Sequence, residues 1–222
     1  FQHRLRQAWK TAHANSILLR STAMAHGARI RLLQALVKPS LLYGSETWKL
    51  TPALLARIIG AERAFSRWCM RLTNRAGRTD DEEGDLAAWV QWQADTAGQI
   101  AKTTNKQKIE RWHVTAIRLH WHWAGKAARN TGTLSQKAAT VHIRPVGSGR
   151  PLAHWAQLLR QLSIKELRGN AESWEQLAQN KVQWMSFCDL FVEFIETQVL
   201  RADTRATLAR DAVAIRQENI EQ

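Results

Sequence analysis

The sequence predicts an all-α protein, in which a basic helical bundle is followed by a second helical region that carries a basic loop. Three observations predict this fold class. The alternation of Val, Ile and Thr that marks half-buried strands is almost absent. Residues that favour helix, namely Ala, Leu, Arg and Gln, dominate the chain. Hydrophobic residues make up 45% and charged residues 23% of the 222, which is typical of a folded protein.

The first predicted elements lie between residues 28 and 72. Residues 28–37 place their apolar side chains on one side of a helix, which Pro39 should end or kink. Gly44 allows the turn that follows. Thr51 is a good N-cap, with Pro52 at the first helical position. The helix that begins there has an apolar stripe at spacings of three and four, made of Leu54, Ile58, Ala61, Phe65, Trp68 and Leu72.

Further helices are predicted along the rest of the chain. Thr79 to Glu82 fits a capping box, with helical pattern from Leu86 and again over 108–129. Residues 130–150 form a loop or extended arm that is rich in Gly, Thr and Ser. Short helices are expected over 152–163 and 171–199, followed by a polar C-terminal helix.

We divide the chain into three regions. Residues 1–79 form a basic helical region, 80–150 an acidic hinge with helices and the basic loop, and 151–222 a C-terminal helical region. The first boundary is placed in the segment 77–84, where glycines and acids gather.

The formal charge of +13 is unevenly distributed. Residues 1–79 hold 14 Lys and Arg against two acids, a net charge of +12, whereas 80–99 carry a net charge of −6. The net charge is +9 over residues 100–150 and −2 over 151–222. Two basic blocks separated by an acidic hinge predict a polyanionic partner that is held at two places.

The apolar runs, the start of the chain and the two cysteines indicate where such a protein is located and how its thiols are used. No apolar run approaches the length that spans a bilayer, so no membrane partner is expected. The chain begins at Phe1 without a leader, so we expect a piece of a longer intracellular protein, nuclear or cytoplasmic. Cys69 and Cys188 stand far apart in apolar stretches, which predicts buried thiols rather than disulfides or a zinc site.

Five segments in a fixed order carry a resemblance. Residues 41–48, Leu-Leu-Tyr-Gly-Ser-Glu-Thr-Trp, resemble the LLYG-x-E-x-W signature after the palm of non-LTR (LINE-type) retrotransposon reverse transcriptases. Residues 62–72 look like the family's E-x-F-x-R-x-x-L-R helix, and 118–129 look like its RLRWxGHxxR segment. Residues 149–155 are similar to GRPxxxW, and 174–184 to the final W-xxx-A-xx-R-xx-W block.

The resemblance implies that residues 1–79 are thumb-like and that the palm precedes them in the same polyprotein. Such a thumb lays helices along an RNA or RNA/DNA template–primer. There are two departures from the family pattern. Lys126 stands where the family usually has His, which keeps a cationic group. The family has a basic run after the GRP tripeptide, which is replaced here by Leu152, Ala153 and His154. This replacement weakens any expectation that the arm binds DNA.

Catalytic residues of a polymerase palm are missing. The palm signature is an aromatic residue followed by two adjacent aspartates that bind metal. Asp80-Asp81 is the one pair of adjacent aspartates in the sequence, and no aromatic residue precedes it. Its position is typical of the start of a helix. We therefore assign no catalytic residue, metal site or cofactor to this chain. The magnesium-dependent, RNA-directed DNA synthesis that the resemblance implies belongs to the palm.

The first group of candidate nucleic-acid-binding residues lies in the thumb-like region. Arginine binds phosphate oxygens in pairs, and a thumb needs phosphate contacts rather than base contacts. The alternative is a solvated basic face. The candidates are Arg4, Arg6, Lys10, Arg29, Arg31 and Lys38.

A second group comes from the interleaved bases and aromatics between residues 111 and 129. Aromatic side chains can stack on nucleobases, and neighbouring cations can bind phosphate. These candidates, with one arginine from the loop, are Arg111, Arg118, Trp121, Trp123, Lys126, Arg129 and Arg150. Five other tryptophans lie among apolar neighbours and are expected in the core, namely Trp48, Trp68, Trp89, Trp92 and Trp184.

The expected function is therefore that of a non-catalytic, thumb-containing fragment of a reverse transcriptase, which binds the phosphate backbone of an RNA or RNA/DNA duplex. Two alternatives stay open. The chain could be a free-standing helical RNA- or DNA-binding protein, or a scaffold whose positive face meets an acidic protein. A decayed copy of a retroelement without activity is also compatible with the resemblance.

Overall fold

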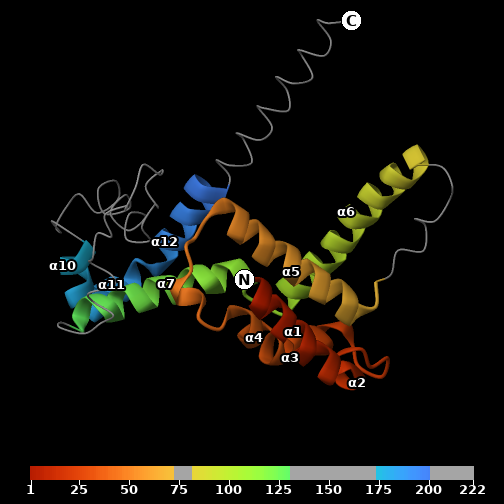
Figure 1. The fold of residues 1–222 in the computed structure, drawn as a ribbon, viewed down its shortest axis with the longest axis horizontal. Helices are drawn as coiled ribbons and strands as arrows, with labels where there is room; N and C mark the ends of the chain where they lie inside the picture. Colours follow the sequence, from red (N-terminus) through yellow and green to blue (C-terminus); the bar gives the residue numbers. More distant parts are fainter. Residues whose placement is uncertain (73–81, 131–173, 201–222) are drawn as a thin grey trace, which may run out of the picture. The chain divides into compact units, whose positions relative to one another are not determined.

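The computed structural model describes residues 1–72, 82–130 and 174–200, and it is all-α, as predicted (Figure 1). The chain groups into two compact units. The first unit consists of Phe1–Tyr43 and Arg57–His113, and the second of Gly44–Ala56 and Val114–Gln222. This grouping differs from the three consecutive regions expected from the sequence, because distant segments pack together within each unit.

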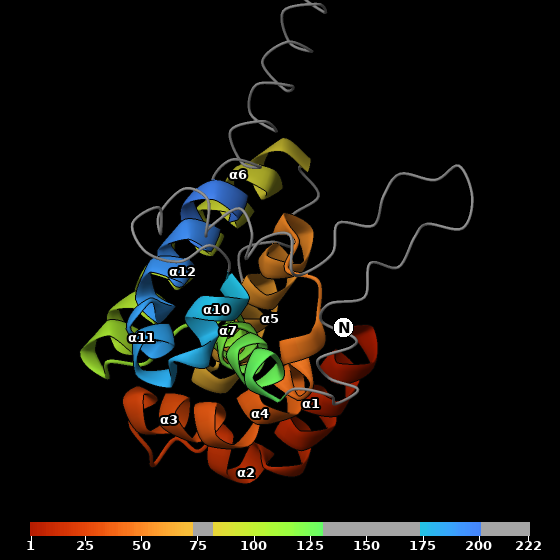
Figure 2. The same ribbon diagram turned by 90° about the vertical axis from the view of Figure 1, so that its left-hand side faces the viewer.

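The first unit begins with four helices that lie close together (Figure 2). They are α1 (Gln2–Ala14), α2 (Ser16–Leu19), α3 (His26–Leu36) and α4 (Lys38–Leu42). Helix α4 packs against both α1 and α3. Helix α3 ends at Leu36, just before Pro39, as predicted. Pro39 then lies in the first turn of α4, where a missing N–H costs no hydrogen bond.

Helix α5 (Pro52–Met70) begins at the predicted N-cap. The Thr51 hydroxyl accepts a hydrogen bond from the amide of Leu54 at 3.2 Å. The helix ends in a Schellman motif, in which the Leu72 amide donates to the Arg67 carbonyl at 2.9 Å. Arg71 adopts the left-handed conformation that this motif requires, with a φ of 61°.

Helix α6 (Glu82–Lys106) ends in the same way. The amide of Ile109 donates to the Thr104 carbonyl at 3.0 Å, and Lys108 is left-handed with a φ of 51°. Residues 79–81 of the predicted capping box lie outside the described residues, as do the expected helices over 152–163 and beyond residue 200.

Aromatic and aliphatic side chains from helices α1 to α6 and the start of α7 (Trp112–Arg129) fill the core of the first unit. The Phe65 ring lies 4.0 Å from the ring of Trp9 and 5.6 Å from that of Trp112. The indole N–H of Trp112 is satisfied by the side-chain oxygen of Gln34 at 2.9 Å. Other buried members are Ala8, Ala12, Leu19, Ile30, Leu33, Val37, Leu41, Ile58, Cys69 and Ile100.

The second unit packs several short helices against α7 (Figures 1 and 2). Short helices were expected over 171–199, and the described part of this segment, from residue 174, consists of several that break at Asn180 and Phe187. Asn180 caps the second piece by accepting from the Gln183 amide at 3.1 Å. The pieces are α10 (Trp174–Gln179), α11 (Lys181–Ser186), α12 (Cys188–Phe194) and the π-helical turn η2 (Ile195–Leu200).

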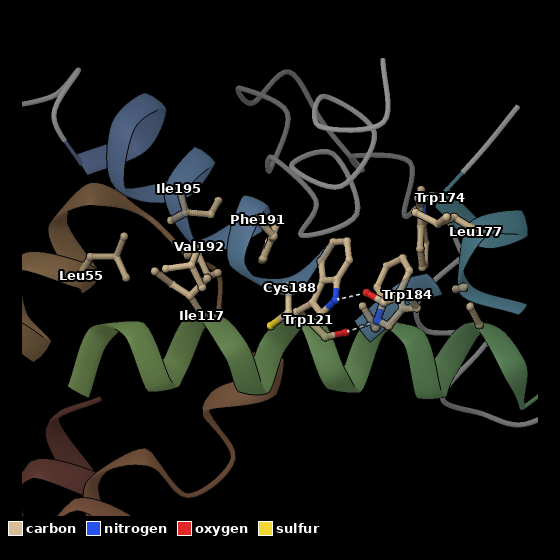
Figure 3. Close-up of a cluster of buried hydrophobic side chains, with 14 residues drawn as sticks. Leu55, Ile117, Trp121, Trp174, Leu177, Trp184, Cys188, Phe191, Val192 and Ile195 are labelled. Carbon is tan, nitrogen blue, oxygen red and sulfur yellow. Dashed lines mark hydrogen bonds between the residues drawn. The ribbon is translucent and has the colours of Figure 1, made fainter. Parts of the chain in front are cut away.

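A buried cluster in the second unit joins these pieces to α7 (Figure 3). Leu50 and Leu55, from residues 44–56, also belong to it. Both cysteines are buried free thiols, Cys69 in the first unit and Cys188 in this cluster, as predicted. Among the described residues, no helix combines the length and apolar character that crossing a bilayer requires.

Candidate nucleic-acid interface

Helix α1 carries an exposed basic stripe. His3, Arg6, Lys10 and His13 recur at spacings of three and four, so their side chains share one face of the helix. We call these four residues the α1 stripe. Ala8 and Ala12 are fully buried on the opposite side. The amphipathic pattern therefore fixes this helix with its cations directed to solvent.

The first unit holds far more bases than acids. Its sequence holds seventeen Lys and Arg against eight acids, five of which fall between residues 80 and 85. Glu62 is 1% exposed and is paired with Arg111, whose Nε lies 2.9 Å from its Oε2. Within the described part of the chain, Arg6, Lys10 and Arg31 are exposed and form no ion pair. Their charges remain available to an external polyanion.

Three further arginines of this unit lie over aromatic rings. The Arg4 guanidinium is 4.3 Å from the ring centroid of Tyr43. A guanidinium stacked in this way is held in place by the ring quadrupole, while its N–H donors point along its own plane. Such an arginine is oriented for paired contacts to phosphate oxygens before any ligand arrives.

The other two pairs each include a residue near the C-terminal end of α5. Arg20 lies 5.4 Å from the ring of Trp68, and Arg67 lies 5.3 Å from the ring of Trp92. Arg67 also donates to the side-chain oxygen of Gln93 at 3.0 Å. We call Arg20, Arg67, Trp68 and Trp92 the arginine–tryptophan cluster.

The electrostatics of this cluster favour an anion. Burial lowers the pKa of Arg67, and the nearby cation of Arg63 lowers it further. A bound phosphate would relieve this repulsion between like charges.

The arginine–tryptophan cluster was not predicted. Trp68 and Trp92 were assigned to the core, but both are only half-buried, and Trp89 is 47% exposed. Trp184 is the member of that group that is fully buried. Each arginine pairs with a ring more than twenty positions away, so spacing along one helix could not reveal the cluster.

Two candidates of the thumb-like region are engaged internally. Arg29 is 4% exposed, and its Nη1 donates to the Cys69 carbonyl at 2.8 Å. It stabilises the carbonyl end of α5, where a cation is favourable, so the prediction that it binds nucleic acid is corrected. Lys38 is half-buried and donates to the Glu110 carbonyl at 3.3 Å. Burial lowers the pKa of Lys38, while the carboxylates of Glu110 and Glu62 act in the opposite direction.

The tryptophan expected to stack on nucleobases stacks on another tryptophan instead. Trp121 is 1% exposed, and its ring lies 3.7 Å from that of Trp184 with 6° between the planes (Figure 3). Each indole N–H donates to the other residue's carbonyl, at 3.0 and 3.1 Å. Because both faces and the N–H are enclosed, the prediction that Trp121 contacts nucleic acid is wrong. Trp112, which lies in the same basic and aromatic stretch, is also fully buried.

Most cations of this second candidate group have partners within the protein. Besides the Arg111–Glu62 pair, Arg118 Nη2 lies 2.5 Å from Asp189 Oδ1. Arg129 donates to the Ala178 carbonyl at 2.7 Å. Lys126 is exposed and Trp123 is half-buried. Arg150 lies outside the described residues.

The two segments noted at residues 118–129 and 174–184 form the packed centre of the second unit. Gly125 permits their close approach, because a Cβ at this position would lie 2.3 Å from Nε1 of Trp184. Trp174 and Trp184 are buried against α7 (Figure 3), and Ala178 belongs to the same buried cluster. The residue types in these segments are therefore explained by packing.

The histidines of α7 differ in their surroundings. His120 is fully buried, and burial lowers its pKa to about 4 although the backbone of Glu46 acts in the opposite direction. His122 Nε2 lies 3.9 Å from Cys188 Sγ. Within the described ranges, no three potential ligands among His, Cys, Asp and Glu come together.

No protein-family model, curated protein or solved structure matches this chain. The functional argument therefore rests on the side chains that the first unit presents to solvent.

Proposed function

We propose that this chain is the thumb and following region of a non-LTR retrotransposon reverse transcriptase, and that its first unit binds the phosphate backbone of an RNA or RNA/DNA template–primer. The observation that carries the proposal is the charge of that unit. The sequence of that unit holds seventeen Lys and Arg against eight acids, and the exposed α1 stripe has no acid paired with it among the described residues. The resemblance in residues 41–184 supports the polymerase context.

The proposed role is positioning. Contacts to phosphate hold a duplex in register without reading its sequence, which suits a polymerase that must copy any template. The α1 stripe supplies cations on one helical face, and Arg31 adds another exposed charge. The stacked arginines of the arginine–tryptophan cluster lose little freedom when they bind phosphate, because their orientation is already set. The palm, with its magnesium, would supply the chemistry.

Salt dependence of binding tests the electrostatic part of this proposal. If binding neutralises about six phosphates, a plot of log Kd against the logarithm of the salt concentration should have a slope of about 5 in magnitude. The 222-residue chain would be titrated with a fluorescent RNA/DNA duplex at several salt concentrations from about 50 to about 300 mM. A flat response would instead favour the protein-interaction scaffold.

Charge-matched variants locate the interface. Arg6→Gln with Lys10→Gln removes two exposed cations of the α1 stripe and should reduce the slope magnitude by about 2. Lys49→Gln with Lys181→Gln removes the same charge from exposed positions of the second unit and should leave the slope nearly unchanged. Equal effects of the two double variants would contradict an interface on α1.

The form of nucleic acid separates the thumb from a general binding protein. A thumb should bind the RNA/DNA duplex more tightly than a single strand of the same length, because its cations are spaced for a helical backbone. Equal affinity would favour the free-standing binding protein. A reading frame in which the sequence before Phe1 encodes an aromatic residue and two adjacent aspartates would support the polymerase assignment.

A further inference from the structure

An open pocket with polar and apolar walls lies between α1 and α4 in the first unit. Its volume is about 430 Å³, within the range of small-molecule sites. Helix α1 contributes four side chains, and the segment from Pro39 to Tyr43 contributes three. The lining residues are His3, Arg4, Gln7, Thr11, Pro39, Ser40 and Tyr43.

One wall of the pocket is a flat cation–aromatic pair. Tyr43 is 67% exposed, although a tyrosine ring carries a large apolar surface. The Arg4 guanidinium covers it at 4.3 Å from the ring centroid. The exposed Tyr43 ring and the guanidinium above it offer a surface on which a nucleobase can stack.

The other wall offers hydrogen-bonding groups. The Thr11 hydroxyl donates to the Gln7 carbonyl at 3.1 Å and lies 3.1 Å from the Ser40 hydroxyl. Because Thr11 has one hydroxyl hydrogen, Ser40 then donates to Thr11 and keeps its own oxygen as an acceptor. The Gln7 side-chain amide adds donors and an acceptor to the same pocket.

We propose that this pocket binds one unpaired nucleotide of the nucleic acid held by the first unit. The base stacks on the Arg4–Tyr43 platform, and its polar edge meets Gln7 and Ser40. His3, which belongs to both the pocket and the α1 stripe, places the nucleotide phosphate beside the cations that bind the backbone. The inference rests on the proposed function, and it adds a stacking site to an interface that otherwise contacts phosphate.

Fluorescence of 2-aminopurine, an adenine analogue that is quenched when it stacks, tests the pocket. The full chain would be titrated with two RNA/DNA duplexes of equal charge, one with an unpaired 2-aminopurine nucleotide and one with it paired. We expect about tenfold tighter binding of the unpaired duplex, which corresponds to about 1.4 kcal/mol. Quenching of the unpaired base should accompany binding.

Substitutions at Tyr43 identify the platform. Tyr43→Leu should abolish the tenfold preference and the quenching, whereas Tyr43→Phe should keep both, because the ring stacks without its hydroxyl. Trp89→Leu removes another exposed aromatic ring of the same unit and should leave the preference intact. Thermal melts followed by circular dichroism would compare the folding of the variants. Equal binding of the two duplexes, or a preference that survives in Tyr43→Leu, would overturn the pocket.

A second probe separates this inference from the proposed function. If duplexes bind with the expected salt slope but without a preference for the unpaired base, the pocket is wrong and the backbone interface stands. If duplexes do not bind while 2-aminopurine riboside 5′-monophosphate binds in a Tyr43-dependent manner, the pocket stands and the proposed function is wrong. If neither probe binds, both are wrong.

Discussion

Tryptophan has two different roles in this chain, and partner residues decide between them. Trp121 and Trp184 enclose each other and exchange hydrogen bonds with each other's carbonyls, so both buried indole N–H groups are satisfied. Trp68 and Trp92 are half-buried and lie beneath arginines. The first pair stabilises the second unit, and the second pair orients cations on the first.

The Trp121–Trp184 stack predicts a strict requirement at position 125. Gly125→Ala should destabilise the protein by about 2–3 kcal/mol, because the new methyl group must displace the Trp184 ring from a well-packed core. Urea unfolding followed by tryptophan fluorescence would measure the loss.

The matched control for this change is Gly98→Ala in α6. A Cβ at Gly98 meets no atom within 4 Å, so this substitution should stabilise by about 0.5–1 kcal/mol through helix propensity. Equal stability of the Gly125→Ala variant and the wild type would refute the tight approach of the two helices.

Burial of His120 predicts a pH dependence of stability. Its pKa is lowered to about 4 in the folded protein, against 6.5 in an unfolded chain. Between these values the unfolded state binds the extra proton, so the free energy of unfolding falls as pH falls from 6.5 to 4. The loss from this residue is up to about 3 kcal/mol, at 1.36 kcal/mol for each pKa unit.

A variant isolates this contribution. His120→Leu has no imidazole to protonate, so its free energy of unfolding should decline less than that of the wild type between pH 6.5 and 4. Urea unfolding at several pH values would give both curves. Parallel curves would show that His120 is accessible to protons in the folded state.

At the scale of helices, α5 and α6 are each followed by a residue whose side chain disfavours the backbone conformation that it adopts. Arg71 follows α5 and Lys108 follows α6, and both adopt positive φ in Schellman motifs. A side chain with a Cβ is strained in this conformation, whereas glycine is not. These helix ends are therefore less stable than the same motifs would be with glycine.

Lys108→Gly should raise the free energy of unfolding by about 1 kcal/mol, because it removes the left-handed strain at an exposed position. Lys102→Gly, which removes the same side chain from the interior of α6, should lower it by about 1 kcal/mol. Chemical denaturation of the two variants measures the difference. A destabilised Lys108→Gly variant would contradict the role assigned to the turn.

At the scale of the whole chain, repulsion between positive charges destabilises the folded state. The formal net charge is +13, and the first unit has seventeen bases against eight acids. Such repulsion destabilises a folded protein and is weakened by salt. Raising NaCl from about 50 to about 300 mM, which shortens the screening length, should therefore raise the melting temperature.

This rise should be smaller in the Arg6→Gln and Lys10→Gln double variant, because two repelling charges are gone. Scanning calorimetry without nucleic acid would measure both proteins. A melting temperature that is independent of salt would indicate that the basic side chains are already compensated within the protein.

The all-α fold class, the start of α5 at Thr51, the buried thiols and the surplus of bases followed from the sequence alone, because propensity, capping and charge are properties of single residues or close neighbours. Tertiary structure decided which arginines and tryptophans face solvent. Spacing along a helix shows which side chains share a face, but it does not show which other element covers that face. Arg29 and Trp121 are therefore enclosed, while Trp92 lies beneath an arginine at the surface of the first unit.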